Sequence, residues 1–520
     1  MKGKYRKDFT GTCTFKQKGI NNMRECGMLL PIASLPSKYG IGCFSKEAYE
    51  FVDQLKEGGQ SYWQILPLGP TGFGDSPYQA FSAFAGNPYF IDLEQLVGEG
   101  LLTEDECEEA DFGDDDRYIA YDKIYKARFK VLKKAYERWK KDHHQFLKSK
   151  LDPETIEYCF YMAVKDHFKS ASWNKWDKDI RLRKPAAVEK YKKMLADEIG
   201  FYEFQQIEFN EQWSRLKAYA NENGIRIIGD IPIYVAFDGA DSWAHPELFQ
   251  FDEECLPKAV AGCPPDAFSA TGQLWGNPLY DWGYHKKDHY SWWIKRMEYS
   301  LKLYDVVRVD HFRGFEAYYS IPYGDPTAEF GHWEKGPGLD LFARLKKSLK
   351  KEELPIIAED LGFLTPEVHE MLKESGFPGM KVLEFAFDSS DTGSASDYLP
   401  HNYSVNSVAY TGTHDNETLV SWYQTITAAE RAMVRDYLYD YATPEEQLYK
   451  SMIALVLRSA AATCIIPMQD WLGLDNSARI NKPSTVGKNW RWRLKKTQLT
   501  KKLQKEICRM TTRYGRMNWE

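Results

Sequence analysis

The chain has 520 residues, and its 68 basic and 75 acidic side chains leave a formal net charge of −7. This length allows two or three ordinary domains, or one large α/β barrel with insertions. The slightly negative charge gives no electrostatic reason to expect nucleic acid as a partner, and a neutral substrate fits better. Aromatic residues make up 15% of the chain; such rings stack well on sugars, although large cores also use them.

The N-terminus is polar and turn-rich, and we expect residues 1–22 to form an extension outside the fold. No apolar signal segment follows it, and no run of about 18 apolar residues occurs in the chain. The nine cysteines are scattered and form no CxxC pair, which argues against a disulfide framework and a zinc site. These features predict a cytoplasmic protein without a membrane segment or a bound metal.

Eight short apolar runs, bounded by Gly, Pro or charge, follow one another along the chain with helical patterns between many of them. They span residues 27–34, 61–68, 224–233, 305–312, 354–362, 380–388, 407–415 and 463–473. Continuous apolar runs are typical of strands that are buried on both faces, and eight parallel strands can close a barrel. We therefore predict an α/β fold, a (β/α)8 TIM barrel that occupies residues 23–520.

Two long spacings between runs predict insertions into this barrel. The second and third runs are much farther apart than one crossover helix requires, and we expect a mostly helical insertion at about 93–215. Its basic helices could bind an acidic surface, but the balanced charge of the whole chain favours a solvated insertion. A second insertion, at about 234–300 between the third and fourth runs, is rich in Gly, Pro and aromatic residues.

Carboxylates stand at the ends of several runs, with Asp310 in the fourth, Glu359 in the fifth and Asp415 in the seventh. The C-terminal ends of the strands form the active-site face of a TIM barrel, so closure would bring the three together. Glycosidic cleavage needs two opposed carboxylates, and we expect Asp310 and Glu359 to lie about 5 to 6 Å apart, as in a retaining pair. A single carboxylate at a strand end is often only a solubilising cap, so the prediction depends on the three carboxylates taken together.

Three further polar residues adjoin these carboxylates. Arg308 lies two residues before Asp310, on the same face of the strand, where its charge would keep Asp310 ionised. His311 and His414 each adjoin a carboxylate and can donate hydrogen bonds to sugar hydroxyls.

The segments RVDHFRG, AEDLG and TGTHDN, in this order, resemble the catalytic segments of the amylomaltases, bacterial 4-alpha-glucanotransferases (disproportionating enzymes) related to the alpha-amylase clan. The resemblance extends over nearly the whole chain from Met28 onward, in stretches such as YWQILPLGPTGFGDSPYQAFSAFAGNPYFIDL, GCPPDAFSATGQLWGNPLYDW and NKPSTVGKNWRWR. It implies transfer of alpha-1,4-glucan segments to an acceptor glucose or glucan, without a cofactor. By this resemblance Asp310 is the nucleophile, Glu359 the general acid and base, and Asp415 the stabiliser of the transition state.

The resemblance also implies a set of substrate contacts, in part from a lid: the loop GCPPDAFSATGQLWGNPLYDW of the second insertion, which in the family covers the cleft. These contacts are Tyr78, Asp230, Asp266, Gln273, Trp275, Arg308, His311 and His414. A covered covalent intermediate meets a sugar more readily than water, which favours transfer, although a Gly/Pro-rich loop can also be purely structural. The chain departs from the family at Pro483-Ser484-Thr485, where Pro-Gly-Thr is usual, so a local turn is expected to differ.

Three other functions remain open from the sequence. An amylase-like hydrolase would use the same carboxylates. A metal-dependent barrel hydrolase would use the Asp310–His311 and His414–Asp415 pairs, but adjacent side chains on an extended strand point to opposite faces and make poor joint ligands. A glucan-binding protein without catalysis would bind sugar and not turn it over. Donor and acceptor length, cyclic products, oligomeric state and the pathway served are not predicted.

Overall fold

The structure is a computed structural model that describes residues 24–72, 74–142, 151–265, 270–362, 364–389 and 397–518. The N-terminal extension expected at residues 1–22 lies outside the described residues, as does Asp266 of the predicted lid.

Eight parallel strands form a closed barrel, and their order around the barrel is their order along the chain. Each strand overlaps one of the eight predicted runs, so the predicted (β/α)8 barrel is confirmed. The strands are β1 (Glu25–Leu29), β2 (Tyr62–Gln64), β3 (Arg226–Ile231), β6 (Val306–Val309), β9 (Ile356–Ala358), β10 (Gly379–Val382), β11 (Ser407–Tyr410) and β12 (Thr463–Pro467). The barrel closes between its first and last strands, where Glu25 pairs with Thr463.

The apolar runs are continuous because alternate residues of each strand enter two different cores. On β3, Ile228 belongs to a cluster to which strands from all round the barrel contribute, whereas Ile227 belongs to the main core, which also contains the helices. Tyr410 and Ala409 divide in the same way on β11. Both faces of the strands are therefore apolar, as expected for a parallel barrel surrounded by helices.

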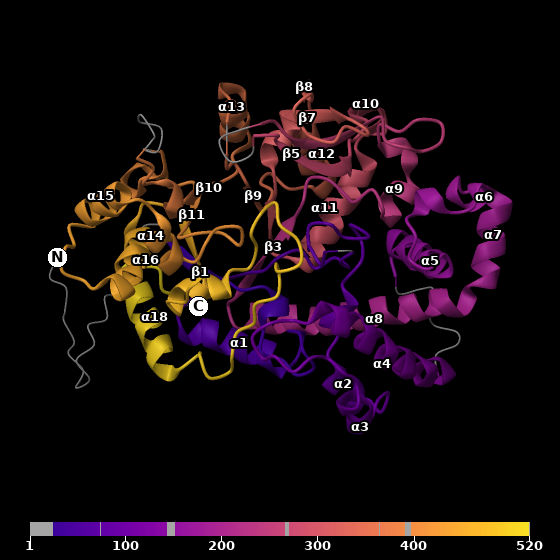
Figure 1. The fold of residues 1–520 in the computed structure, drawn as a ribbon, viewed down its shortest axis with the longest axis horizontal. Helices are drawn as coiled ribbons and strands as arrows, with labels where there is room; N and C mark the ends of the chain where they lie inside the picture. The colour runs from indigo at the N-terminus through magenta and orange to yellow at the C-terminus, as the bar shows by residue number, and fades with distance from the viewer. Residues whose placement is uncertain are drawn as a thin grey trace.

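Helices surround the barrel and cover its outer face (Figure 1). They are α1 (Lys46–Glu57), α8 (Ala196–Glu222), α11 (Ser291–Leu303), α12 (Leu339–Leu349), α13 (Pro366–Ser375), α14 (Leu419–Thr425), α15 (Ala428–Leu438), α16 (Leu448–Arg458), α17 (Met468–Trp471) and α18 (Lys501–Arg513). On α12, Leu341, Phe342 and Leu345 are buried and form the apolar stripe of an amphipathic helix. The C-terminal α18 contacts both α1 and α16.

The insertion predicted between the second and third barrel strands is present and helical. It contains α2 (Leu93–Gly98), α3 (Glu104–Glu108), α4 (Tyr121–Asp142), α5 (Pro153–His167), α6 (Lys178–Arg181) and α7 (Pro185–Met194). Figure 1 shows α4 to α7 gathered on one side of the molecule, next to the long crossover helix α8. A separate apolar cluster, with Phe160 on α5, Trp173 and Trp243, supplies this part with a core of its own.

Two strands of the second insertion and two strands that follow the fourth barrel strand form a small antiparallel sheet, with strand order β5-β4-β7-β8. Between β3 and β6 the chain forms α9 (Ala240–Ala244), β4 (Ala259–Cys263), β5 (Gln273–Pro278) and α10 (Trp282–Lys287). The other two strands, β7 (Ala317–Pro322) and β8 (His332–Lys335), follow the fourth barrel strand. The sequence analysis did not predict this sheet. Its edge strand β8 is polar and exposed and gives no apolar run, and the buried strand β7 was not singled out.

Two observations concern the predictions on compartment. None of the helices formed by the described residues is long and apolar enough to cross a membrane. Eight of the nine cysteines lie in the described part of the chain, and all eight are free thiols.

Candidate active site

A buried arginine joins two carboxylates at the C-terminal end of the barrel. Arg308 on β6 is paired in register with Asp230 on β3, and its Nη1 donates hydrogen bonds to both carboxylate oxygens of Asp230 at 2.9 and 2.7 Å. The same nitrogen donates to Oδ1 of Asp310 at 2.9 Å. Arg308 and Asp230 are almost completely buried, and Asp310 is the partly exposed member of the three. Burial raises the pKa of Asp230, and the Arg308 guanidinium acts in the opposite direction.

The chain turns sharply after Asp310 and brings it next to Glu359. His311 has φ +51°, in the left-handed region, and its N–H donates to Oε2 of Glu359 at 2.7 Å. His311 therefore lies in a turn and not on an extended strand. Burial lowers the pKa of His311 to about 4, so its imidazole is neutral at neutral pH. None of the described residues makes a hydrogen bond to its buried Nε2.

Glu359 follows β9 and has surroundings that favour its protonated form. Its Oε1 accepts a hydrogen bond from the N–H of Leu361 at 2.7 Å, and its Oε2 accepts the one from His311. Burial raises the pKa of Glu359 to about 8, and the nearby Asp310 carboxylate adds to the rise, while Arg308 and the two N–H groups oppose it. Glu359 is therefore a proton donor at neutral pH, whereas Asp310 is held against a guanidinium.

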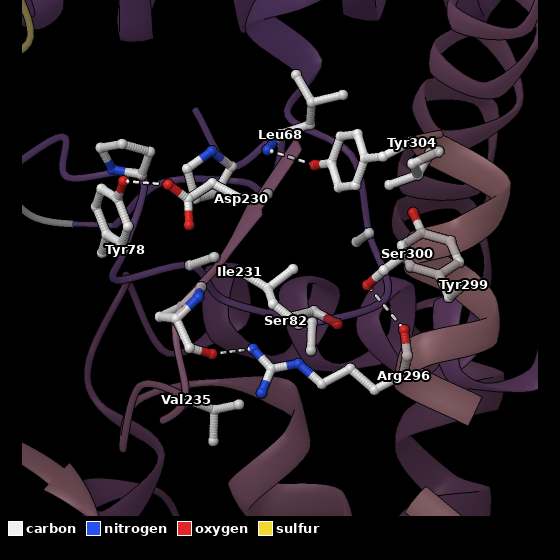
Figure 2. Close-up of a pocket in the computed structure, with 18 of the residues that line it drawn as sticks. Leu68, Tyr78, Ser82, Asp230, Ile231, Val235, Arg296, Tyr299, Ser300 and Tyr304 are labelled. Carbon is white, nitrogen blue, oxygen red and sulfur yellow. Dashed lines mark hydrogen bonds between the residues drawn. The ribbon is translucent and has the colours of Figure 1, made fainter. Parts of the chain in front are cut away.

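Tyr78 links the loop after β2 to two other strand ends. Its hydroxyl donates to Oδ2 of Asp230 at 2.9 Å (Figure 2), and its ring stacks on that of His414, with centroids 5.1 Å apart and planes at 18°. His414 is buried, and its Nε2 lies 3.3 Å from Oδ1 of Asp415. The structure thus brings residues that follow β2 and β11 together with Asp230 of β3 into one wall of the site.

The segment after β12 supplies residues that the sequence analysis did not single out. The Asn481 side chain donates to Oδ1 of Asp415 at 2.6 Å, and the ring of Trp490 lies 5.9 Å from those of Tyr78 and His414. Both residues lie in NKPSTVGKNWRWR, where only the resemblance gave a signal. In the same segment Ser484 has φ +61°, so a serine adopts the backbone region that glycine favours.

Several predicted runs extend past the ends of their strands. The sixth run reaches Asp388 although β10 ends at Val382, and the seventh and eighth runs likewise continue beyond Tyr410 of β11 and Pro467 of β12. The acidic residue next to the end of β10 is Glu384, which is buried behind the loop of Asp415 and approaches Gly412. Burial raises the pKa of Glu384 well above its ordinary value, and Asp470 adds to the rise.

The small sheet places one predicted lid residue, Trp275, against the turn that follows Asp310. Trp275 on β5 meets the ring of His311 edge-on, with centroids 4.9 Å apart. Its indole N–H donates to Oε1 of Gln273 at 3.1 Å. The third predicted contact of this loop, Asp266, lies outside the described residues.

A pocket behind Asp230 separates this carboxylate from α11 (Figure 2). On its far side the buried Arg296 donates to the carbonyl oxygen of Pro232 at 2.6 Å and to that of Ile233 at 3.0 Å. The hydroxyl of Tyr304 accepts a hydrogen bond from the N–H of Leu68 at 3.2 Å. The two Arg296 bonds hold the chain just after β3, where it leaves the barrel towards the small sheet, and the Tyr304 bond holds the chain that follows β2.

Among the described residues, no group of three or more His, Cys, Asp or Glu side chains is placed to hold a metal ion.

The chain is similar to known proteins over most of its length. A family model described as 4-alpha-glucanotransferase matches residues 30–500. A 4-alpha-glucanotransferase of Clostridium butyricum is 51% identical over 489 residues, which are 93% of this chain and 99% of that protein. A 4-alpha-glucanotransferase of Thermus thermophilus is 45% identical over 491 residues, which are 91% of this chain and 95% of that protein. The solved structure of an amylomaltase from Streptococcus agalactiae, in complex with acarbose, is 41% identical, covers 95% of this chain and 100% of that one, and superimposes with a TM-score of 0.91. With this likeness in sequence and in fold, the chain belongs to the 4-alpha-glucanotransferase family.

Proposed function

We propose that this member of the 4-alpha-glucanotransferase family moves segments of alpha-1,4-glucan from a donor to an acceptor glucose or glucan by a retaining double displacement. The observation that carries the proposal is the contrast between two neighbouring carboxyl groups. Asp310 is hydrogen-bonded to the Arg308 guanidinium, while the pKa of Glu359 is raised to about 8. One carboxylate that is held by a guanidinium and one carboxyl that keeps its proton suit the two roles that a retaining enzyme requires.

In the first step Asp310 attacks the anomeric carbon of the donor. The bond from this carbon to the leaving glucan oxygen breaks, and that oxygen takes the proton of Glu359. Because Arg308 holds Oδ1 of Asp310, Oδ2 would form the glycosyl ester. Asp415 would stabilise the positive charge that develops on the sugar ring.

In the second step the hydroxyl group of an acceptor glucan attacks the same carbon. Glu359, now a carboxylate, takes the hydroxyl proton, and the ester bond to Asp310 breaks. The glycosidic bond is restored and both side chains return to their starting state. Water would compete with the acceptor, and the contact between Trp275 and His311 covers one approach to the catalytic turn.

The remaining substrate contacts are proposed on the same basis. Tyr78, His414, Asp230 and Arg308 form one connected wall, on which the ring of Tyr78 offers a face for a sugar and the polar groups offer partners for its hydroxyls. Asp266, Gln273, Trp275 and His311 would contact the sugar from the lid side. The acarbose complex of the related amylomaltase supports an alpha-glucan ligand for this cleft.

Two further proposals concern the chain as a whole. The free thiols of the described cysteines suit a reducing compartment, and we place the enzyme in the cytoplasm. We also take residues 23–520 as one catalytic unit, with insertions at about 93–215 and 234–300, and residues 1–22 as an extension outside it. A variant that lacks residues 1–22 should then transfer glucan at the same rate as the full chain.

A product profile from purified enzyme and maltotriose tests the proposed function. Transfer should give free glucose and a ladder of longer maltooligosaccharides while the number of reducing ends stays constant. EDTA should leave the rate unchanged, because the two carboxyl groups supply nucleophile and proton. If reducing ends rise steadily and nothing longer than maltotriose appears, the enzyme is an amylase-like hydrolase, the alternative function.

A further inference from the structure

Asp415 and Asp310 are held by chemically different partners. Asp310 receives a hydrogen bond from the Arg308 guanidinium, whereas Oδ1 of Asp415 receives one from the neutral amide of Asn481 at 2.6 Å. Nε2 of His414 lies 3.3 Å from the same oxygen. The proposed nucleophile therefore accepts its hydrogen bond from a guanidinium, whereas Asp415 accepts one from a neutral amide.

The backbone beside Asn481 is fastened to the backbone of the Asp415 loop. The N–H of Asn481 donates to the carbonyl oxygen of His414 at 3.1 Å. The Arg479 guanidinium donates to the carbonyl oxygen of Asp415 at 2.7 Å and to that of Asn481 at 2.8 Å. Arg479 thus contacts the main chain of Asp415 and leaves its carboxylate to the Asn481 amide.

A second contact anchors this segment at the start of α14. The side chain of Asn476 donates to Oε1 of Glu417 at 2.6 Å and accepts from the N–H of Thr418 at 3.1 Å. Its own N–H donates to the hydroxyl of Ser421 at 2.8 Å. The segment 476–481 is therefore attached to the chain on both sides of Asp415, and the position of the Asn481 amide is fixed before substrate binds.

We infer that Asn481 is a positioning residue, which holds one carboxylate oxygen of Asp415 so that the other faces the reacting sugar with its negative charge intact. The Asp415 side chain is 46% exposed, and without this bond it would rotate between rotamers and turn towards water. An arginine at the same place would orient the carboxylate but offset the charge that has to stabilise the cationic transition state. The inference rests on the proposed function, in which Asp415 is the stabiliser.

Two substitutions at position 481 separate positioning from general support of the loop. Asn481→Ala removes the bond to Asp415 and should lower kcat for maltotriose disproportionation about 10- to 100-fold, with KM changed less than about threefold, because the loss is felt mainly in the transition state. Asn481→Asp places a second carboxylate against Asp415, and the repulsion should move the acidic limb of the kcat profile upward by about one pH unit or more. Loss of packing alone would not shift that limb.

Asn489 provides a matched control in the same segment. Its side chain donates to the carbonyl oxygens of Thr485 at 2.8 Å and Lys482 at 3.2 Å, so it holds the following loop without contacting Asp415. Asn489→Ala should keep kcat and the pH profile close to those of the wild type. Thermal unfolding of each variant verifies that it is folded. If Asn481→Ala does not fold, the pH profile of Asn481→Asp alone tests the positioning role.

The outcomes separate this inference from the function on which it rests. An Asn481→Ala enzyme with wild-type kcat, an Asn481→Asp enzyme with an unshifted acidic limb, or an equal loss in Asn489→Ala would each overturn the positioning role. Asp415→Asn, measured alongside, should lose nearly all turnover. A fully active Asp415→Asn enzyme would instead remove the role proposed for Asp415, whatever Asn481 does.

Discussion

The indole ring of Trp275 stands edge-on to the imidazole of His311, with centroids 4.9 Å apart and planes at 89°. Trp275 belongs to the small sheet that follows the third barrel strand, and His311 is the residue directly after Asp310. The small sheet is therefore in contact with the turn that follows Asp310, the proposed nucleophile. In the proposed mechanism this contact lets a structure outside the barrel influence which molecule reaches the covalent intermediate.

Replacing Trp275 by Ala should raise the ratio of hydrolysis to transfer several-fold and slow both reactions, because it opens the covered side of the site and removes a sugar contact. Reducing ends and longer products, measured over time from maltotriose, give this ratio. Trp333→Ala is a suitable control, since Trp333 is 40% exposed on β8, at the other edge of the same sheet. An unchanged ratio in Trp275→Ala would show that the lid does not exclude water.

The raised pKa of Glu359 predicts an alkaline limit to activity. Glu359 keeps its proton up to about pH 8, so kcat should fall as the pH rises through about 8, when the general acid is lost. Glu359→Gln should lack most activity on maltotriose, and a donor whose leaving group needs no proton should restore the first step. A kcat profile that stays flat to pH 10 would contradict this role.

The same pKa shift predicts how stability depends on pH. The unfolded chain loses the Glu359 proton near its ordinary pKa of about 4.3, while the folded chain holds it to about 8. The folded state binds more protons across this window, so this group lowers the free energy of unfolding as the pH rises from about 4.3 to 8. Urea unfolding of the wild type and of Glu359→Gln at several pH values should show that the free energy of unfolding falls less with rising pH in the variant.

Asp310→Asn should reduce turnover by about 10³-fold or more, because an amide cannot form the glycosyl ester. The variant should remain folded, since Arg308 keeps both of its bonds to Asp230. Chromatography of maltotriose digests and a thermal unfolding curve of the same sample give both results. Near-normal transfer by this variant would mean that another residue is the nucleophile.

Arg308→Gln should destabilise the protein by about 3 kcal/mol, because it leaves the buried Asp230 without its charged partner. Lys178→Ala provides a comparison: Lys178 pairs with Glu254 at 3.0 Å on the surface, with 62% of its side chain exposed, and its loss should cost less than about 1 kcal/mol. Denaturant unfolding midpoints distinguish the two. If both variants unfold alike, the buried pair adds nothing to stability.

The sequence alone predicted the barrel and placed the proposed catalytic carboxylates at the ends of its strands, because both features leave a local pattern in the chain. Strands buried on both faces need continuous apolar runs, and a polar residue that follows such a run lies at the strand end. Asp310 and Glu359 could therefore be placed on one face before any contact was known. The same rule was wrong about Asp388, because it cannot tell where a strand stops within a run.

Only the tertiary structure decided which loops meet around these carboxylates. Tyr78, His414 and Trp490 form one aromatic group although they follow β2, β11 and β12, and Asn481 reaches Asp415 across 66 positions of sequence. Such contacts depend on closure of the barrel between β1 and β12, which is a pairing of distant segments. A local pattern of polar and apolar residues indicates whether a residue is buried, but not which distant residue it contacts. The neighbours that orient the proposed catalytic groups are therefore decided only by closure of the barrel.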